Sequence, residues 1–277
     1  MDRYAVIGHP IAHSKSPRIH AAFARQTGQL LSYEAILAPL DGFVDAVHAF
    51  RAAGGRGMNV TVPFKLEAFA LANRHTDRAR TAGAVNTLVF DGHDILGDNT
   101  DGAGLVRDLS ANLGCTLNGR RVLLLGAGGA ARGALLPLLQ TAPRRLVLAN
   151  RSVSKAVELA EAFHALAGTV ELTVSSFSEL AGQQFDLVIN ATAASLSAEA
   201  PPLPAGVHAP GALAYDMMYS RDETAYLAAA RLDGASRLAD GLGMLVEQAA
   251  ESFTLWRGIR PDTAPVLAEL RRELRAA

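Results

Sequence analysis

The stretch Arg121–Ala131 constrains the fold of this chain more than any other segment. An apolar run is followed by the glycine turn Gly126-Ala127-Gly128-Gly129-Ala130, and helical apolar spacing then continues to residue 140. With Ala131 as the small third residue, the turn fits G-x-G-x-x-G/A, in which glycines let a pyrophosphate approach the start of a helix. The pattern predicts a dinucleotide-binding unit, although a tight turn without a ligand has the same glycines.

The end of the next apolar strand distinguishes the two nicotinamide cofactors. A site selective for NAD places Asp or Glu there, to hold the ribose 2′-hydroxyl. This chain instead has the run Asn150-Arg151-Ser152-Val153-Ser154-Lys155. Because a guanidinium matches phosphate oxygens two at a time, the run favours NADP(H). A second interpretation, in which Ser152 caps a helix and Arg151 is a solvated charge, is compatible with the first.

The composition limits the kinds of protein that this chain can be. Its 277 residues are 49% hydrophobic and carry a formal net charge of −1, which predicts one or two domains and no binding of nucleic acid or membranes. A single cysteine, Cys115, excludes an internal disulfide and fits a cytoplasmic protein. The chain begins in a strand-like segment rather than a signal peptide, and it has no apolar run near the roughly 18 residues of a membrane span.

Lysine is rare here, which draws attention to Lys65. Only three of the 26 lysine and arginine residues are lysines. Lysine can be deprotonated in a protein and arginine cannot, so a retained lysine is a candidate for proton transfer. Lys65 follows the predicted strand 57–62, so Asn59, Thr61 and Lys65 should cluster near its carboxyl end, where open α/β sheets bind ligands.

Four further polar residues have both a structural and a functional interpretation. Ser14 and Ser16 precede a helix, where they either cap it or help to bind a carboxylate. Asn86 interrupts the apolar run 83–90, and a buried amide needs partners, which are either the backbone or a ligand. Asp101 lies in the polar segment 97–102, where it is either a helix cap or a side chain that projects into a ligand site.

The order of the predicted elements indicates an α/β protein with two domains. Residues 1–102 are expected to form an α/β substrate-binding and catalytic domain. Residues 103–239 alternate strand and helix, as in a doubly wound Rossmann-type dinucleotide domain. Two helices within residues 240–277 are expected to return to the first domain and complete it. We also expect helices at 41–52, capped by Asp41, and near 76–82.

Taken in order, these motifs resemble those of the shikimate/quinate dehydrogenase family over nearly the whole chain. The segments that carry the resemblance are His13–Pro17, Asn59–Lys65, Gly83–Thr87, Gly97–Gly102, Gly126–Ala130, Asn150–Ser152, Tyr215–Tyr219 and Asp240–Met244. The resemblance implies reversible reduction of 3-dehydroshikimate to shikimate with NADPH, in chorismate and aromatic amino-acid biosynthesis. It implies no metal, a small-molecule substrate, and a monomer or homodimer.

The resemblance also implies roles for individual residues. It makes Lys65 and Asp101 the catalytic pair. The other implied contacts are Ser14, Ser16 and Tyr219 with the substrate carboxylate, Thr61, Asn86 and Gln248 with the ring or its hydroxyls, Met217 and Gly241 with the nicotinamide, and Asp77 on the cofactor side. Two positions depart from the family pattern. Ser152 stands where threonine is frequent, and Ser195 stands where glycine is usual.

Two alternatives to this function stay open. One is a dehydrogenase of broader specificity that also accepts quinate, against whose NAD-using members Arg151 argues. The other is a non-catalytic NADP-binding regulator, against which the presence of both Lys65 and Asp101 argues. Turnover with both acids and both cofactors separates the three.

Overall fold

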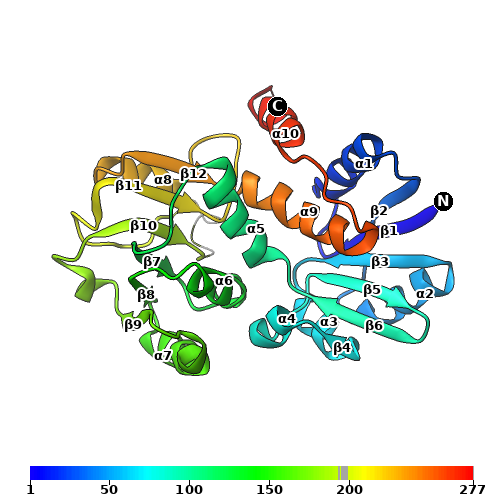
Figure 1. Ribbon diagram of the computed structural model, residues 1–277, viewed down its shortest axis with the longest axis horizontal. Coiled ribbons are helices and arrows are strands. Elements are labelled where there is room, and N and C mark those ends of the chain that lie inside the picture. Colours follow the sequence, from blue (N-terminus) through cyan, green and yellow to red (C-terminus); the bar gives the residue numbers. More distant parts are fainter. Residues whose placement is uncertain (193, 195–198, 277) are drawn as a thin grey trace. The chain divides into compact units, whose positions relative to one another are not determined.

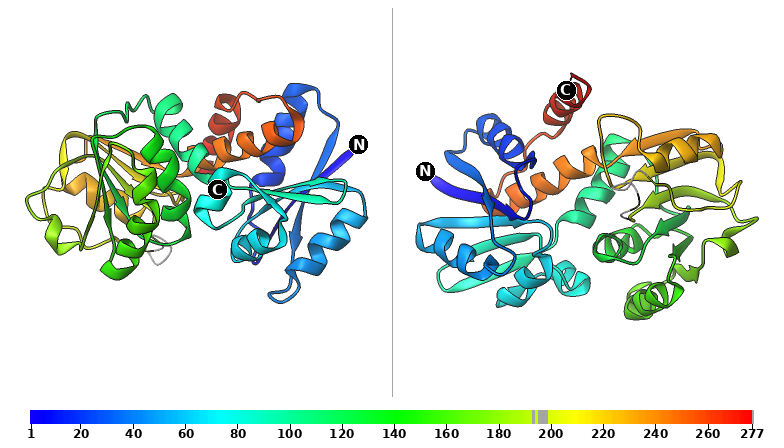
Figure 2. Two further views of the ribbon diagram at one scale, coloured as in Figure 1. Left: turned by 60° about the horizontal axis from the view of Figure 1, so that its bottom comes forward. Right: turned by 180° about the vertical axis from the view of Figure 1, so that it is seen from behind.

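The computed structural model describes residues 1–192, 194 and 199–276, which divide into two compact units. The first unit comprises Met1–Gly104 and Val246–Leu267, and the second comprises Leu105–Leu245 and Ala268–Ala277. Each unit contains one six-stranded sheet flanked by helices (Figures 1 and 2). The boundaries differ from the predicted ones, because residues 240–245 and the last ten residues belong to the second unit rather than the first.

The sheet of the first unit is mixed, with strand order β2-β1-β3-β5-β6-β4. β1 runs parallel to β2 and β3, whereas β5 runs antiparallel to both β3 and β6. Its elements are β1 (Asp2–Gly8), α1 (Ser16–Thr27), β2 (Leu31–Leu37), α2 (Phe43–Ala52), β3 (Gly55–Val60), α3 (Lys65–Leu71), β4 (Arg74–His75), α4 (Asp77–Ala82), β5 (Thr87–Asp91) and β6 (Asp94–Asp98). Three later helices, α5 (Asp101–Arg107), α9 (Leu242–Arg257) and α10 (Ala264–Ala276), contribute residues to both units.

The two faces of this sheet are covered differently. One face packs an apolar cluster that includes Phe43, Met58 and Phe64 beneath α2 and α3. On the α1 side, the ring of His20 stacks on Tyr33 with 4.2 Å between centroids and also lies near Phe253 of α9. Burial of these aromatic side chains therefore attaches part of α9 to the first sheet although it comes from the far end of the sequence.

The sheet of the second unit is entirely parallel, with strand order β12-β11-β10-β7-β8-β9. Counted within the unit, this is the doubly wound 6-5-4-1-2-3 order of a dinucleotide-binding fold. Its elements are a π-helical turn (Asp108–Asn112), β7 (Arg121–Leu125), α6 (Gly129–Gln140), β8 (Arg145–Ala149), α7 (Val153–Phe163), β9 (Glu171–Ser175), β10 (Phe185–Asn190), β11 (His208–Asp216), α8 (Ala225–Leu232) and β12 (Arg237–Asp240), with short 3₁₀ turns at His164–Leu166 and Ser178–Leu180.

Alternate residues of β7 show how the second sheet is enclosed. Val122 and Leu124 belong to the apolar cluster formed with α6 and α7, whereas Leu123 and Leu125 belong to the cluster formed with α8. All four side chains have no exposed area. A strand buried on both faces explains the continuous apolar run that precedes the glycine turn.

Several local predictions were wrong. Residues 94–98, part of them interpreted as a polar turn, form β6 and complete a hairpin with β5. Helix α2 starts at Phe43 with Gly42 in the cap position, so Asp41 does not cap it. Helix α1 has Lys15 in the cap position, and Ser16 is its first helical residue. Ser152 occupies the cap position of α7 but accepts no capping hydrogen bond.

Two kinds of feature are missing from the described residues. Among the described helices, none is long and apolar enough to cross a membrane. Within the same residues, no group of three or more His, Cys, Asp or Glu side chains is arranged to hold a metal ion.

Candidate active site and nucleotide site

Strand direction gathers the polar loops of the first unit at one edge of its sheet. β1 and β3 are parallel and both end at this edge. β5 is antiparallel to β3 and therefore begins there, with Asn59 opposite Thr87. β6 is antiparallel to β5 and ends there, with Asp98 opposite Thr87. The segments that carry Lys65, Asn86 and Asp101 thus leave the sheet at the same edge, where α/β sheets hold ligands.

Lys65 and Asp101 form an ion pair at this edge. Lys65 is the first residue of α3, Asp101 is the first residue of α5, and Lys65 Nζ lies 2.6 Å from Asp101 Oδ2. The side chain of Lys65 is 32% exposed and that of Asp101 is 17% exposed. Because the pair is only partly covered, a substrate can reach it without a change in the surrounding core. The ammonium is the only proton donor of the two when both groups are charged.

The amide of Asn86 has one orientation, which its hydrogen bonds fix. Asn86 Oδ1 accepts hydrogen bonds from the backbone N–H and the hydroxyl of Thr100 and from the Thr87 hydroxyl. A backbone N–H is only a donor, so this end of the amide is the oxygen. Asn86 Nδ2 consequently points to Asp101 and donates to its Oδ1 at 2.8 Å. The carboxylate of Asp101 therefore receives one donor on each oxygen.

A buried polar network supports Asn86 from behind. Thr87 Oγ1 lies 2.8 Å from Ser252 Oγ, and Asn59 Nδ2 donates to both hydroxyls. Asn59 Oδ1 in turn accepts from the Tyr33 hydroxyl at 2.7 Å. Thr87 and Ser252 have no exposed area and Asn59 is 6% exposed. Such fully bonded buried networks hold their members in one geometry.

Sequence reasoning placed Asn59 near the site but did not assign Thr87, Ser252 or Tyr33 to it. Ser252 follows Gln248 by four residues, which places both on one face of α9, and this spacing was the available signal. Thr87 directly follows Asn86. Tyr33 carried no local signal, because its contact with Asn59 depends on the pairing of β2, β1 and β3.

A buried ion pair holds the loop that carries Asp101. Arg78 donates from Nε and Nη2 to the two oxygens of Asp98, at 2.7 and 2.6 Å, and the Asp98 side chain is 1% exposed. Asp98 Oδ1 also accepts from the backbone N–H of Asn99, whose own Oδ1 accepts from the backbone N–H of Asp101. Burial by itself raises the pKa of Asp98, but the bonds from Arg78 and Thr76 outweigh it, so the pKa is lowered.

The remaining predicted substrate residues of this unit lie on three different segments. Ser14 and Ser16 are adjacent in space, since the Ser16 backbone N–H donates to Ser14 Oγ at 3.3 Å. The side chain of Thr61 lies against Gly8, where an added Cβ would come within 2.4 Å of Thr61 Cγ2. Gln248 Oε1 lies 3.4 Å from the Thr100 hydroxyl.

In the second unit, the glycine turn follows β7 next to the end of β10. Gly126 has a φ of +107°, and an added Cβ would lie 3.1 Å from the carbonyl oxygen of Ala191. The turn therefore lies at the switch point between the first and fourth strands, where a dinucleotide crosses the sheet. An added Cβ at Gly128 or Gly129 would meet no atom within 4 Å, and no side chain caps α6. Gly128, Gly129 and Ala130 are exposed, so a phosphate has access to the backbone N–H groups of this turn.

The residues predicted to bind the 2′-phosphate follow β8. Arg151, Ser152, Val153, Ser154 and Lys155 are all exposed, and Asn150 Nδ2 donates to the Ser152 carbonyl. The Ser152 and Ser154 hydroxyls lie 3.2 Å apart. No carboxylate ends β8 at this point, so the local charge is positive and suits an anion.

The predicted nicotinamide residues lie on two turns, Met217 directly after β11 and Gly241 directly after β12. Asp216 has no exposed area and accepts from Asn190 Nδ2, the Met218 N–H and the Thr224 hydroxyl, which fixes the turn. The backbone N–H of Gly241 donates to the Met218 carbonyl at 3.0 Å. An added Cβ at Gly241 would lie 2.1 Å from the Met217 carbonyl oxygen. Only glycine allows these two backbone segments to approach so closely.

Three other predicted positions have different outcomes. Tyr219 lies in the second unit, whereas Ser14 and Ser16 lie in the first. Burial and the charge of Asp240 raise the pKa of Tyr219, so its phenol is a neutral donor at ordinary pH. The Asp77 side chain is 89% exposed and pairs with Arg80. Ser195 lies outside the described residues.

Comparisons with known proteins identify the family of this chain. Family models match residues 6–88 (shikimate dehydrogenase substrate binding domain), 108–198 (shikimate / quinate 5-dehydrogenase) and 241–271 (shikimate 5'-dehydrogenase C-terminal domain). A shikimate dehydrogenase (NADP(+)) from Aromatoleum aromaticum is 70% identical over 99% of this chain and 98% of its own. The chain belongs to the shikimate dehydrogenase family.

Two further family members, one of them a solved structure, are also similar to this chain over nearly its whole length. A shikimate dehydrogenase (NADP(+)) from Dechloromonas aromatica is 65% identical over 99% of this chain and 98% of its own. The crystal structure of shikimate 5-dehydrogenase from Thermus thermophilus, in complex with NADP(H) and shikimate, is 34% identical with a TM-score of 0.86, and the match covers 98% of this chain and 99% of that one. The two-domain α/β fold is therefore that of the family.

Proposed function

We propose that this chain catalyses the reversible, NADPH-dependent reduction of 3-dehydroshikimate to shikimate. The observation that carries the proposal is the ion pair between Lys65 and Asp101, at 2.6 Å, with Asn86 holding the carboxylate from its other side. The curated relatives that share most of their sequence with this chain are shikimate dehydrogenases (NADP(+)), and the Thermus thermophilus enzyme was crystallised with both ligands. This reaction belongs to chorismate and aromatic amino-acid biosynthesis.

The catalytic pair divides two tasks. NADPH, when bound, supplies the hydride that reduces the ketone carbon. Lys65 donates a hydrogen bond to the ketone oxygen, stabilises the negative charge that develops there, and supplies the proton. Asp101 holds the ammonium in place and accepts a hydrogen bond from a substrate hydroxyl. In the reverse direction the neutral amine of Lys65 removes the proton from the alcohol.

The remaining polar residues fix the orientation of the substrate. The hydroxyls of Ser14 and Ser16, beside the start of α1, and the neutral phenol of Tyr219 supply donors for the carboxylate. Thr61, Asn86 and Gln248 supply hydrogen bonds to the ring hydroxyls. A site built from such polar pairs rejects an analogue that lacks a hydroxyl by on the order of 10⁴-fold.

The second unit holds NADP(H). The exposed amides at Gly128, Gly129 and Ala130, with Gly126 and Ala127 before them, suit the pyrophosphate. Asn150, Arg151, Ser152, Val153, Ser154 and Lys155 suit the 2′-phosphate, and Met217 and Gly241 would border the nicotinamide. Asp77, which belongs to the first unit, would lie on the cofactor side, as the family resemblance implies. We expect the enzyme to be cytoplasmic and to act as a monomer or homodimer.

Oxidation of NADPH in the presence of 3-dehydroshikimate tests the proposal. We expect turnover by the wild type and a fall in kcat of about 10²- to 10⁴-fold in Lys65→Ala, with a much smaller change in KM. Asp101→Asn should also lower kcat strongly, whereas Asp45→Asn, an isosteric change at an exposed position of α2, should not. A wild-type protein that binds NADP(H) without turnover would instead be a regulator.

The closest alternative, an enzyme that also oxidises quinate, is separated in the same assay. Comparison of kcat/KM for shikimate with NADP and for quinate with NAD measures both preferences. The basic run after β8 favours the first pair of substrates.

A further inference from the structure

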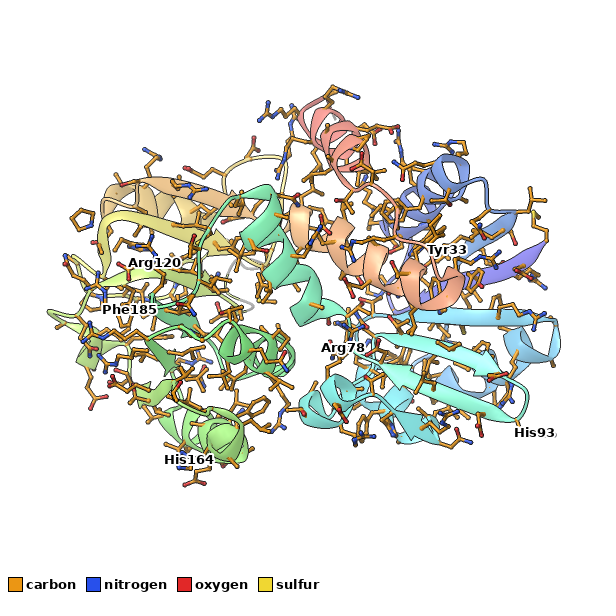
Figure 3. All side chains as sticks on the ribbon, viewed as in Figure 1. Tyr33, Arg78, His93, Arg120, His164 and Phe185 are labelled. Carbon is orange, nitrogen blue, oxygen red and sulfur yellow. The ribbon has the colours of Figure 1, made fainter. Side chains whose placement is uncertain are left out.

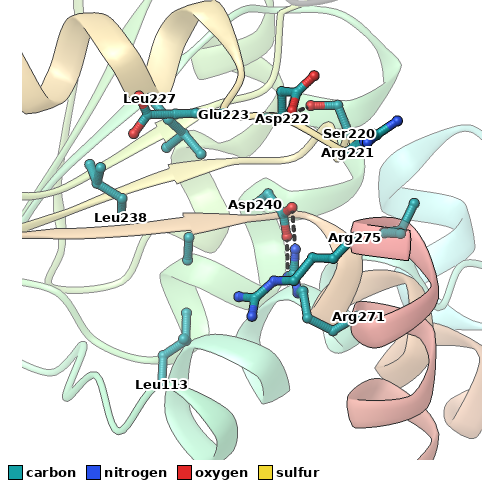
Figure 4. Close-up of a pocket in the computed structure, with 12 residues that line it drawn as sticks. Leu113, Ser220, Arg221, Asp222, Glu223, Leu227, Leu238, Asp240, Arg271 and Arg275 are labelled. Atoms are coloured by element: carbon teal, nitrogen blue, oxygen red, sulfur yellow. Dashed lines mark hydrogen bonds and ion pairs between the residues drawn. The ribbon is translucent and has the colours of Figure 1, made fainter. Parts of the chain in front are cut away.

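The C-terminal helix contributes a partly buried ion pair that the proposed function does not use. Arg271 of α10 reaches Asp240, the last residue of β12, and donates from Nη1 and Nη2 to its two carboxylate oxygens at 2.6 and 2.5 Å (Figure 4). The Asp240 side chain is 10% exposed and that of Arg271 is 35% exposed. Two parallel bonds of this kind restrict both position and angle, which a single contact does not.

Asp240 connects this ion pair to the start of α9. The Leu242 backbone N–H donates to Asp240 Oδ1 at 3.2 Å, so the carboxylate accepts a hydrogen bond from the first residue of α9. Between them stands Gly241, whose N–H bonds to the Met218 carbonyl and whose Cα faces the Met217 carbonyl without room for a Cβ. Any shift of Asp240 therefore moves the backbone of Gly241 relative to Met217.

A second carboxylate, that of Asp108, lies at the same helix start and interacts electrostatically with Arg271. Tyr215 donates to Asp108 Oδ2 at 2.7 Å, and an added Cβ at Gly243 would lie 2.0 Å from Asp108 Oδ1. Asp108 is 3% exposed, so two carboxylates flank the first turn of α9. The positive end of the helix dipole partly stabilises both carboxylates, and the guanidinium of Arg271 adds a full positive charge beside Asp240.

The hollow beside this ion pair does not offer a separate anion site. Figure 4 shows Asp240 and Arg271 among its lining side chains. Its three cations are matched by three carboxylates, and the lining charged residues are Arg221, Arg271, Arg275, Asp222, Glu223 and Asp240. The charge of Arg271 is thus directed to Asp240 rather than to a ligand in the hollow.

We propose that Arg271 is a positioning residue for the nicotinamide half of the cofactor, acting through Asp240 on the contact between Gly241 and Met217. The inference rests on the proposed function, in which Gly241 and Met217 border the nicotinamide. The two hydrogen bonds from Arg271 to Asp240 involve neither the glycine turn after β7 nor the basic run after β8. Binding of the rest of the dinucleotide should therefore not depend on Arg271.

Comparison of two ligands tests this role. NADP⁺ carries the nicotinamide, and 2′-phospho-ADP-ribose lacks it. Dissociation constants are measured by calorimetry. Arg271→Leu should raise the dissociation constant of NADP⁺ about tenfold and that of 2′-phospho-ADP-ribose less than about twofold. Arg271→Lys should recover part of the loss, and Arg272→Leu, at the exposed neighbouring position, should change neither constant.

The double variant Asp240→Asn/Arg271→Leu and a test of folding complete the design. Because both charges are removed, it should bind NADP⁺ better than Arg271→Leu alone. If Arg271→Leu does not fold, Arg271→Lys and Asp240→Asn carry the same comparison between the two ligands. If the substitution weakens the binding of both ligands equally, or weakens the binding of neither, the positioning role is wrong. Absence of turnover in a wild type that shows the expected binding would overturn the proposed reaction alone.

Discussion

Asn86 donates from Nδ2 to Asp101 Oδ1 at 2.8 Å while Lys65 donates to the other oxygen of the same carboxylate at 2.6 Å. The two donors differ in charge and in mobility. The Asn86 amide is fixed by the backbone of Thr100, whereas Lys65 reaches the carboxylate at the end of a flexible side chain. Asp101 is therefore oriented by the neutral donor and remains available to the charged one.

An Asn86→Asp substitution tests that orientation. It keeps the shape of the side chain but places a carboxylate against Asp101, and two such groups at hydrogen-bond distance cannot both be ionised easily. We expect kcat to fall about 10²-fold or more at neutral pH, with a pH–rate profile displaced from that of the wild type. Steady-state rates between pH 6 and 9 provide the measurement. A parallel profile with unchanged kcat would show that Asn86 does not orient the catalytic carboxylate.

Arg151 should determine the choice between the two cofactors. Arg151→Glu replaces a cation with the group that NAD-selective sites use, and it repels a 2′-phosphate. We expect KM for NADPH to rise about tenfold or more while kcat/KM for NADH does not fall. Arg144→Ala is a suitable control, because Arg144 is also exposed but precedes β8 instead of following it. Equal losses with both cofactors would assign Arg151 to folding rather than to selectivity.

The chemistry-bearing segments could be predicted because each depends on local sequence. The glycine turn requires residues that tolerate a φ of +107° or a close backbone, and the run that forms β7 is apolar because both faces of the strand are buried. The family resemblance added Lys65, Asn86 and Asp101 to the predicted functional residues. The structure places these three side chains in contact through the pairing of β3, β5 and β6.

What could not be predicted depends on contacts between distant segments. Tyr33 bonds to Asn59 from an edge strand, and Ser252 reaches Asn59 across 193 positions. The hairpin of β5 and β6 was missed because β6 has only two large apolar residues, Ile95 and Leu96, and ends in residues that were interpreted as a polar turn. The ion pair of Arg271 with Asp240 joins two segments that are distant in sequence, and neither one indicates contact with the other.

Loss of Arg78 should destabilise the loop that carries Asp101. Arg78 (labelled in Figure 3) provides two of the bonds to Asp98, which is 1% exposed. Arg78→Leu leaves this carboxylate buried with its charge uncompensated, and we expect a loss of about 3 kcal/mol in the free energy of unfolding. The double variant Arg78→Leu/Asp98→Asn should recover part of this loss. Urea denaturation at pH 7 measures the free energy of unfolding of both variants. If the double variant were the less stable of the two, the ion pair would not be the source of the effect.

The carboxylate of Asp98 should also make the stability of the folded protein depend on pH in acid. Its pKa is lowered in the folded state from an ordinary value of 3.8, so the stability it contributes is fully present above about pH 4 and is lost as the pH falls through the folded value. The difference in unfolding free energy between the wild type and Asp98→Asn should therefore narrow below that pH. A constant difference down to pH 2.5 would show that the pKa of Asp98 is the same in the folded and unfolded states.

We expect His20 to cause a loss of stability that begins at a higher pH than the loss due to Asp98. Its ring is completely buried against Tyr33, and neither ring nitrogen has a hydrogen-bond partner among the described residues. Burial lowers the pKa to about 3 from the usual 6.5, and the neighbouring Asn59 side chain opposes the shift only in part. Between these two values the unfolded chain binds a proton at this residue that the folded chain does not bind, so folding becomes less favourable as the pH falls.

This single proton should cost about 1.4 kcal/mol of unfolding free energy for each pH unit below 6.5, in a range where most carboxylates remain ionised. His20→Phe keeps an aromatic ring against Tyr33 and removes the titrating group, so its unfolding free energy should fall less steeply between pH 6 and 4.5. His93→Gln, at an exposed position, should follow the wild type. Urea denaturation at several pH values gives the three slopes. Identical slopes for His20→Phe and the wild type would mean that His20 is accessible to protons in the folded protein.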